Sequence, residues 1–201
     1  MSMSPRSQRP LCPLCLRPAS ACICRWITPT GNQVDVLLLQ HPLEAGHAKN
    51  SLRLLQLSLA RRTVAVGEVF APDRLEALLY KSPPDGAQPL LLYPGTAGTA
   101  PGPRDTAQPV RLVVLDATWR KSRKMLALNP ALQALPRLAL SAPPPSQYLI
   151  RKAHRPDQLS TLEAVCHALA QLEGDSARYE ALLTAFDGFV AQQLACRDRR
   201  R

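Results

Sequence analysis

The chain of 201 residues contains no long apolar run. No stretch approaches the roughly 18 consecutive apolar residues that a membrane-spanning helix needs. The first ten residues are polar and lack the apolar segment of a secretory signal peptide. No internal repeat divides the chain. We therefore expect a cytoplasmic protein without a membrane partner, folded as one domain with at most a small appendage.

Acidic residues are scarce relative to basic ones. The 15 Asp and Glu residues stand against 25 Lys and Arg residues, so the formal net charge is +10. Apolar residues make up 46% of the chain, which is enough to build a core. A basic protein raises the local concentration of polyanions, and nucleic acid is the first candidate partner. Charge alone does not establish that partner.

Four of the six cysteines lie within thirteen residues, in the pattern C-x2-C-x6-C-x-C: Cys12, Cys15, Cys22 and Cys24. In a reducing compartment, such spacing predicts metal binding rather than disulfides. Two closely spaced thiolate pairs suit tetrahedral Zn²⁺, and four protein ligands leave no open position for a substrate, so the zinc would be structural. Unligated thiols and a redox C-x-x-C pair remain alternatives.

Short apolar runs alternate with amphipathic segments along the rest of the chain. The predicted strands are residues 34–40, 63–66, 90–93, 112–115 and 138–140. The predicted helices are residues 51–62, 72–79, 120–128, 160–172 and 177–194, and residues 96–109 form a loop rich in Gly, Pro and Thr. This alternation predicts an α/β fold with a mainly parallel sheet and flanking helices.

The apolar run at residues 112–115 ends in Asp116, with Thr118 and Trp119 close behind it. A carboxylate at the end of a buried strand is unfavourable unless it is hydrogen-bonded or functional. Parallel sheets place ligands outside the carboxyl ends of their strands, so Asp116 marks a candidate site. Trp119 could stack on a base or an adenine, or it could belong to the core.

Polar residues in three other loops could meet Asp116 at the same edge of the sheet. These loops span residues 41–51, 93–95 and 160–163. Ser160 and Glu163 have the spacing of a capping box at a helix start. His41 and Glu44 could form a metal pair or an acid/base pair, or His41 could satisfy a local hydrogen bond.

Two basic clusters flank these loops. The first comprises Arg120, Lys121, Arg123 and Lys124, and the second comprises Arg151, Lys152 and Arg155. Phosphates beside a reactive site would suit both clusters, which favours RNA. A solvated helix face is the alternative for the first cluster.

The order and spacing of these motifs are specific when they are taken together. They are the amino-terminal C-x2-C-x6-C-x-C, His41-Pro42-x-Glu44, Lys49-Asn50-Ser51, Leu92-Tyr93-Pro94-Gly95, Asp116-x-Thr118-Trp119-x-x-Ser122-Arg123-Lys124-Met125, Tyr148-x-x-Arg151-Lys152 and Leu159-Ser160-Thr161-x-Glu163-Ala164. Over nearly the whole chain, this set resembles the DTW-domain proteins and supplies the Asp, Thr and Trp that give the family its name. Ser51 stands where Thr is common in the family, and the hydroxyl is kept.

The resemblance implies a tRNA-uridine aminocarboxypropyltransferase. Such an enzyme transfers the 3-amino-3-carboxypropyl group of S-adenosylmethionine to N3 of a uridine and leaves methylthioadenosine. The variable loop is the preferred position, and a D-arm uridine is the alternative. The family resembles the SPOUT class, which implies a knotted carboxyl-terminal sheet. An RNA methyltransferase of the SPOUT type and a non-catalytic, zinc-containing RNA-binding module are the alternatives.

The resemblance also implies roles for particular residues. The expected catalytic residues are Asp116, Thr118 and Trp119, and Asp116 either removes the N3 proton as a general base or only orients the uridine. The expected cofactor-binding residues are Asn50, Ser51, Leu92, Tyr93, Pro94, Gly95, Leu115, Leu159, Ser160, Thr161 and Glu163. His41 joins the two basic clusters as an expected RNA-binding residue.

The resemblance also implies how the chain divides into domains. A flexible tail spans residues 1–10, a zinc-binding element 11–30, the DTW catalytic domain 31–195 and a basic tail 196–201. The sequence leaves open whether the protein is a monomer or a homodimer, and which tRNAs it selects.

Overall fold

The computed structural model describes residues 10–47, 50–81, 86–94, 108–141, 146 and 159–198. Its strands are β1 (Asp35–Gln40), β2 (Arg62–Val66), β3 (Gln88–Leu92), β4 (Val110–Asp116) and β5 (Arg137–Leu138). Its α-helices are α1 (Leu52–Ser58), α2 (Pro72–Tyr80), α3 (Trp119–Leu128), α4 (Pro130–Gln133), α5 (Thr161–Glu173) and α6 (Ala177–Asp198). Two 3₁₀ turns, η1 (Ala19–Ala21) and η2 (Cys24–Trp26), precede them. None of the helices in the described part of the chain is long and apolar enough to cross a membrane.

The five strands form one sheet in the order β2-β1-β4-β3-β5, and every neighbouring pair is parallel. This confirms the predicted α/β class and parallel sheet. Gln40 at the end of β1 pairs with Val66 of β2 and with Asp116 of β4. The carboxyl ends of the central strands therefore lie level with one another, and the loops that follow them start at the same edge of the sheet.

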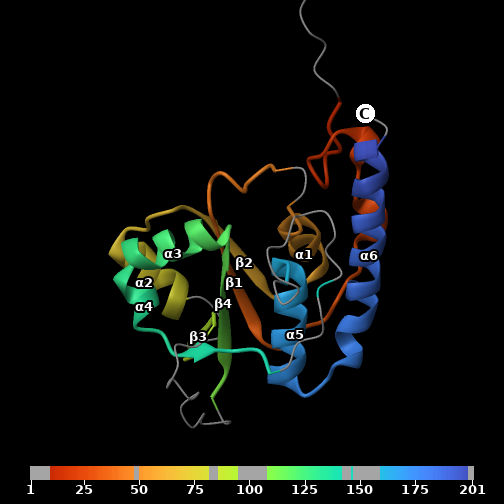
Figure 1. The fold of residues 1–201 in the computed structure, drawn as a ribbon. Coiled ribbons are helices and arrows are strands. Elements are labelled where there is room, and N and C mark those ends of the chain that lie inside the picture. The colour runs from red at the N-terminus through yellow and green to blue at the C-terminus, as the bar shows by residue number, and fades with distance from the viewer. Residues whose placement is uncertain are drawn as a thin grey trace, which may run out of the picture.

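Helices cover both faces of the sheet, because side chains of the central strands alternate between two apolar clusters. Val36 and Leu38 of β1 belong to a cluster with α1, α5 and α6. Leu37 and Leu39 belong to a second cluster with α2, α3 and α4. Figure 1 shows the resulting three layers, with α2, α3 and α4 on one side of the sheet and α1 and α5 on the other. The central strands are buried on both faces, as their continuous apolar runs predict.

The cysteine-rich segment near the amino terminus packs against α6, at the other end of the chain (Figure 1). The Trp26 indole N–H donates to Gln192 of α6, and the Gln192 amide donates to the Cys22 carbonyl at 2.9 Å. Gly188 makes this approach possible, because a Cβ there would lie 2.2 Å from the Trp26 ring. The expected zinc element is thus docked on the main domain.

Two helix predictions differ from the structure. The helix expected over residues 51–62 ends at Ser58, because Leu59 adopts an extended conformation and bridges to Thr30. Arg62 then starts β2 by pairing with Val36. After the helix predicted at residues 120–128, the structure has a further short helix, α4, which begins at Pro130, where the fixed φ of proline suits a first helical position.

The remaining strand and helix predictions agree with the structure to within a few residues. Residues 1–9 of the expected flexible tail and most of the expected loop at 96–109 lie outside the described residues, as do 199–201 of the basic tail. Within that carboxyl-terminal tail, α6 continues to Asp198.

Candidate active site at the carboxyl edge of the sheet

Asp116 ends β4 with its carboxylate buried, at 3% exposure. Its Oδ2 accepts hydrogen bonds from the Gln40 side-chain amide at 2.9 Å and from the Asn50 side-chain amide at 2.8 Å. Its Oδ1 accepts a third from the Thr161 hydroxyl at 2.7 Å. The donors come from the end of β1, the residues before α1 and the start of α5. One carboxylate therefore connects three segments that are distant in sequence.

Asn50 makes hydrogen bonds with its backbone N–H and C=O and with both the nitrogen and the oxygen of its side-chain amide. Besides donating to Asp116, its side chain accepts from the Leu52 N–H at 2.7 Å and so caps the start of α1. Its N–H donates to the His47 carbonyl at 2.9 Å, and its own carbonyl accepts from the Arg17 guanidinium at 2.8 Å. Ser51 is the residue before the helix, but its side chain does not cap it. The cap of this helix is thus Asn50, a residue type that favours helix starts.

The start of α5 carries the predicted capping box. The Ser160 hydroxyl accepts from the Glu163 N–H at 3.2 Å, and the Glu163 carboxylate accepts from the Ser160 N–H at 2.7 Å. The Ser146 hydroxyl donates to the same carboxylate, at 2.9 Å to Oε2. This reciprocal pairing fixes the first turn of the helix and, with it, the Thr161 hydroxyl that meets Asp116.

An aromatic pair lies at the start of α3. Trp119 is 46% exposed and meets the ring of Tyr93 edge-on, with ring centroids 5.8 Å apart. The Arg137 guanidinium lies over the Tyr93 ring, 5.4 Å from its centroid. Trp119 is therefore not a core residue, and a half-exposed indole at the start of α3 can stack on a planar ring. Thr118 precedes the helix and is exposed, and its side chain makes no capping hydrogen bond.

His41 follows Gln40 and is buried. Its Nδ1 accepts from the Leu43 N–H at 3.1 Å, so Nε2 carries the hydrogen and donates to Glu68 at 3.1 Å. The other Glu68 oxygen pairs with Lys124 at 2.9 Å, and these two partners lower the pKa of Glu68, Lys124 more than His41. Both ring nitrogens of His41 are thus engaged within the protein.

The four cations of α3 fall into two groups, the lysines, which form ion pairs, and the arginines, which are exposed to solvent. Lys121 pairs with the buried Glu44 at 2.9 Å, and Lys124 pairs with Glu68. Arg120 and Arg123 are exposed and lie three residues apart, on the same side of the helix. Two of the four expected RNA-binding cations on this helix therefore already pair with carboxylates, while two face solvent.

The other predicted site residues flank this cluster where they are described. Leu92 and Tyr93 end β3 and begin its loop, Leu115 precedes Asp116, and Leu159 precedes the capping box. Pro94 is exposed, and its carbonyl accepts from Arg137 at 3.3 Å. Gly95, Arg151, Lys152 and Arg155 lie outside the described residues.

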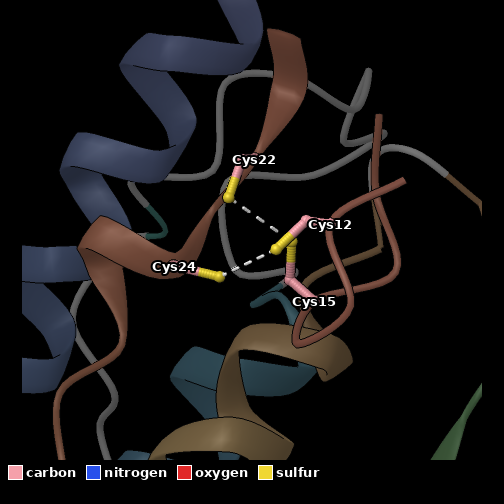
Figure 2. A group of neighbouring side chains, drawn as sticks. All are labelled: Cys12, Cys15, Cys22 and Cys24. Carbon is pink, nitrogen blue, oxygen red and sulfur yellow. Dashed lines mark hydrogen bonds between the residues drawn. The ribbon is translucent and has the colours of Figure 1, made fainter. Parts of the chain in front are cut away.

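The four clustered cysteines point their sulfurs toward one another, as Figure 2 shows. The Cys12 and Cys24 sulfurs are 3.5 Å apart, those of Cys15 and Cys22 are 3.7 Å apart, and all four lie within 4.8 Å of one another. A tetrahedral zinc with bonds of about 2.3 Å places sulfurs about 3.8 Å apart, so the group fits a metal ion.

Local contacts favour a thiolate at Cys12. Hydrogen bonds, first of all from the backbone of Cys15 and Leu14, lower the pKa of Cys12 to about 6. Burial, reinforced by the neighbouring thiols, raises the pKa of Cys24 to about 12. Because thiolates are the form that binds metal, Cys12 is more readily available as a metal ligand than Cys24 at neutral pH.

Several residues of the site were not predicted from the sequence. Gln40 carries a usable signal, because it is a polar residue at the end of an apolar strand. Arg17, Glu68 and Arg137 carry none, because each reaches its partner across a long stretch of chain. Ser146 also carries no such signal, since it reaches Glu163 from a separate segment of the chain.

These features define an α/β protein with a candidate ligand site at the carboxyl edge of a parallel sheet and, docked on its helices, a four-cysteine element whose geometry fits a metal ion. The DTW domain matches residues 9–194, and the chain belongs to the DTW-domain family. This confirms the resemblance seen in the sequence. No solved structure matches the chain significantly.

Curated relatives carry one name. The tRNA-uridine aminocarboxypropyltransferase 2 of Drosophila melanogaster is 34% identical over 178 residues, covering 86% of this chain and 70% of that protein. The mouse protein of the same name is 29% identical, covering 93% of this chain and 64% of its own length. The Macaca fascicularis protein is 27% identical, covering 96% and 67%. The chain thus spans about two thirds of the length of these relatives.

The hydrogen bond from Thr161 to Asp116 can be tested by a matched pair of variants. Thr161→Val keeps the side-chain shape but removes the donor, so we expect the free energy of unfolding to fall by about 1–3 kcal/mol. Thr161→Ser keeps the donor, and we expect a change of less than about 1 kcal/mol. Urea denaturation measures both values. Equal stability of the Val and Ser variants would show that this bond does not hold α5 to the strand end.

Proposed function

We propose that this protein transfers the 3-amino-3-carboxypropyl group of S-adenosylmethionine to N3 of a uridine in tRNA and releases methylthioadenosine. The curated relatives are named tRNA-uridine aminocarboxypropyltransferases, which supports the transfer of this group to a tRNA uridine, and the family match covers residues 9–194. The observation that carries the proposal is the position of Asp116. It is the aspartate of the family motif, and it is buried where the ends of β1 and β4 meet the starts of α1 and α5.

Asp116 is suited to receive the N–H of a bound base. A carboxylate offers about four acceptor positions. Three hydrogen bonds from the protein occupy both positions of Oδ2 and one of Oδ1. The remaining position on Oδ1 would take the uridine N3–H, so that Asp116 orients the base and accepts its proton as N3 attacks.

Orientation must also decide which carbon of the donor reacts. S-adenosylmethionine supplies a sulfonium with three electrophilic carbons, and only the carbon of the aminocarboxypropyl arm leads to this product. We assign its binding to the loops after β1 and β3 and to the start of α5, where Asn50, Tyr93 and Ser160 lie. The half-exposed Trp119 ring would stack on the adenine or on the target base.

The relation to the SPOUT class is part of this proposal. The parallel sheet and the site at its carboxyl edge are compatible with that class. The knot stays a prediction, because apart from Ser146 the segment between Ser141 and Leu159 lies outside the described residues.

The tRNA would approach the edge of the sheet from which Arg120 and Arg123 project. Both are exposed beside Trp119, and the net charge of +10 favours a polyanion. Lys121 and Lys124 would contribute less, because Glu44 and Glu68 already pair with them. We assign the variable-loop uridine as the target and residues 31–195 as the catalytic domain.

Mass spectrometry of tRNA nucleosides tests the reaction. Purified protein is incubated with S-adenosylmethionine and unmodified tRNA, and we expect aminocarboxypropyluridine with an equal amount of methylthioadenosine. A tRNA whose variable-loop uridine is replaced by cytidine serves as the matched control and should remain unmodified. A methyl-sized addition with adenosylhomocysteine would identify a methyltransferase instead. Bound but unmodified tRNA would identify a non-catalytic RNA-binding protein.

We propose that the four-cysteine group at residues 11–30 holds a structural zinc ion. With four protein ligands the ion would have no position for a substrate, so its contribution is to the fold of the element. All six cysteines are free thiols in the structure, which suits a reducing compartment, and we propose the cytoplasm as the location.

Elemental analysis tests the metal. We expect about one zinc ion per chain in the wild-type protein and none in a Cys12→Ser/Cys15→Ser double variant. Cys196→Ser, which changes a cysteine outside the group, should retain the zinc. Wild-type protein that is zinc-free, folded and active would contradict the assignment.

A further inference from the structure

Arg17, a residue of the four-cysteine element, reaches the candidate active site with its side chain. Arg17 follows the second cysteine, and its backbone is part of the metal-binding turn, since its carbonyl accepts from the Cys12 N–H at 2.7 Å. Leu16, just before it, has a positive φ of 57°, so the turn is held in a conformation that side chains rarely adopt. The position of Arg17 therefore depends on the fold of this turn.

The Arg17 side chain leaves the element and enters the main domain. It is only 8% exposed, and its guanidinium lies over the Phe189 ring of α6, 5.1 Å from the centroid. From there its Nη2 donates to the Asn50 carbonyl at 2.8 Å. A buried guanidinium held against an aromatic ring is a rigid donor, so it restricts where that carbonyl can lie.

Asn50 connects Arg17 to Asp116, so a fixed position of the Asn50 backbone also fixes the donor to the carboxylate. Its backbone carbonyl is held by Arg17, and its side-chain amide donates to the Asp116 carboxylate at 2.8 Å. Because the same residue also caps α1, a change at its carbonyl moves both the helix start and the donor. Two hydrogen bonds, Arg17 to Asn50 and Asn50 to Asp116, therefore connect the cysteine turn to the carboxylate.

We propose that Arg17 is a positioning residue, through which the four-cysteine element holds Asn50 and Asp116 in the geometry that transfer requires. This role rests on the proposed transfer reaction. It gives the element a function in catalysis although none of its cysteines hydrogen-bonds to Asp116. Small displacements of groups that orient reactants lower turnover strongly, so loss of the Arg17 contact should lower kcat more than it lowers tRNA affinity.

Three variants test this role. Arg17→Met keeps the length and apolar contact of the side chain but removes the donors, and Arg17→Lys restores a cationic donor. Arg53→Met is the matched control, because Arg53 also contacts the element, through the Leu14 carbonyl at 2.6 Å, but makes no hydrogen bond to Asn50 or Asp116 among the described contacts. Each variant is assayed for zinc content, for kcat and KM with tRNA, and for hydrogen exchange.

We expect Arg17→Met to keep its zinc, to bind tRNA with a KM within about threefold of wild type, and to lose about tenfold or more in kcat. Its backbone amides at residues 50–55 should exchange faster, while those of β1 and β4 should not change. Arg17→Lys should recover most of the kcat, and Arg53→Met should stay within about threefold of wild type.

Several results would overturn the role. They are a wild-type kcat in Arg17→Met, loss of zinc in that variant, an equal loss of kcat in Arg53→Met, or unchanged exchange at residues 50–55. Loss of zinc would make Arg17 a part of the metal element only. The exchange measurement needs no substrate, so it decides on the coupling even if wild-type protein fails to transfer the group, which would contradict the proposed function separately.

Discussion

The hydrogen bonds onto the buried Asp116 carboxylate are the interaction on which the rest of the site depends. A buried carboxylate is strongly destabilising unless donors surround it, and here Gln40, Asn50 and Thr161 supply them. Each donor comes from a different segment, so satisfying one charge brings the end of β1 and the starts of α1 and α5 together. Arg17 extends this set toward the cysteine turn by holding the Asn50 carbonyl.

The parallel sheet makes this convergence possible. β1 and β4 are neighbours in the centre of the sheet, and Gln40 pairs directly with Asp116. Their apolar side chains alternate between two helical layers, so the polar residues at the strand ends are the first that can meet a ligand. The half-exposed Trp119 and the exposed Arg120 follow three and four residues after the carboxylate, at the start of α3.

Local patterns predicted most of the fold and part of the site. Apolar runs located the strands, and the capping box was correct because its partners lie only three residues apart. Predictions failed where distant segments decide the outcome. The helix after Asn50 ends early because Leu59 bridges to Thr30, and Arg17 reaches Asn50 across 33 positions. No periodicity in a sequence encodes such a contact. The pairing of Lys121 with Glu44 is equally hidden in the sequence, because the two residues belong to separate motifs.

The most direct test of the central role of Asp116 is the steady-state rate of aminocarboxypropyl transfer by Asp116→Asn, measured beside its affinity for tRNA. An asparagine keeps the size of the side chain. Its amide N–H groups, however, would replace one of the two oxygens that accept hydrogen bonds from Gln40, Asn50 and Thr161. We predict tRNA affinity close to wild type, because the exposed cations of α3 are unchanged, with most of the turnover lost. Full turnover in a folded Asp116→Asn protein would contradict the role assigned to this carboxylate.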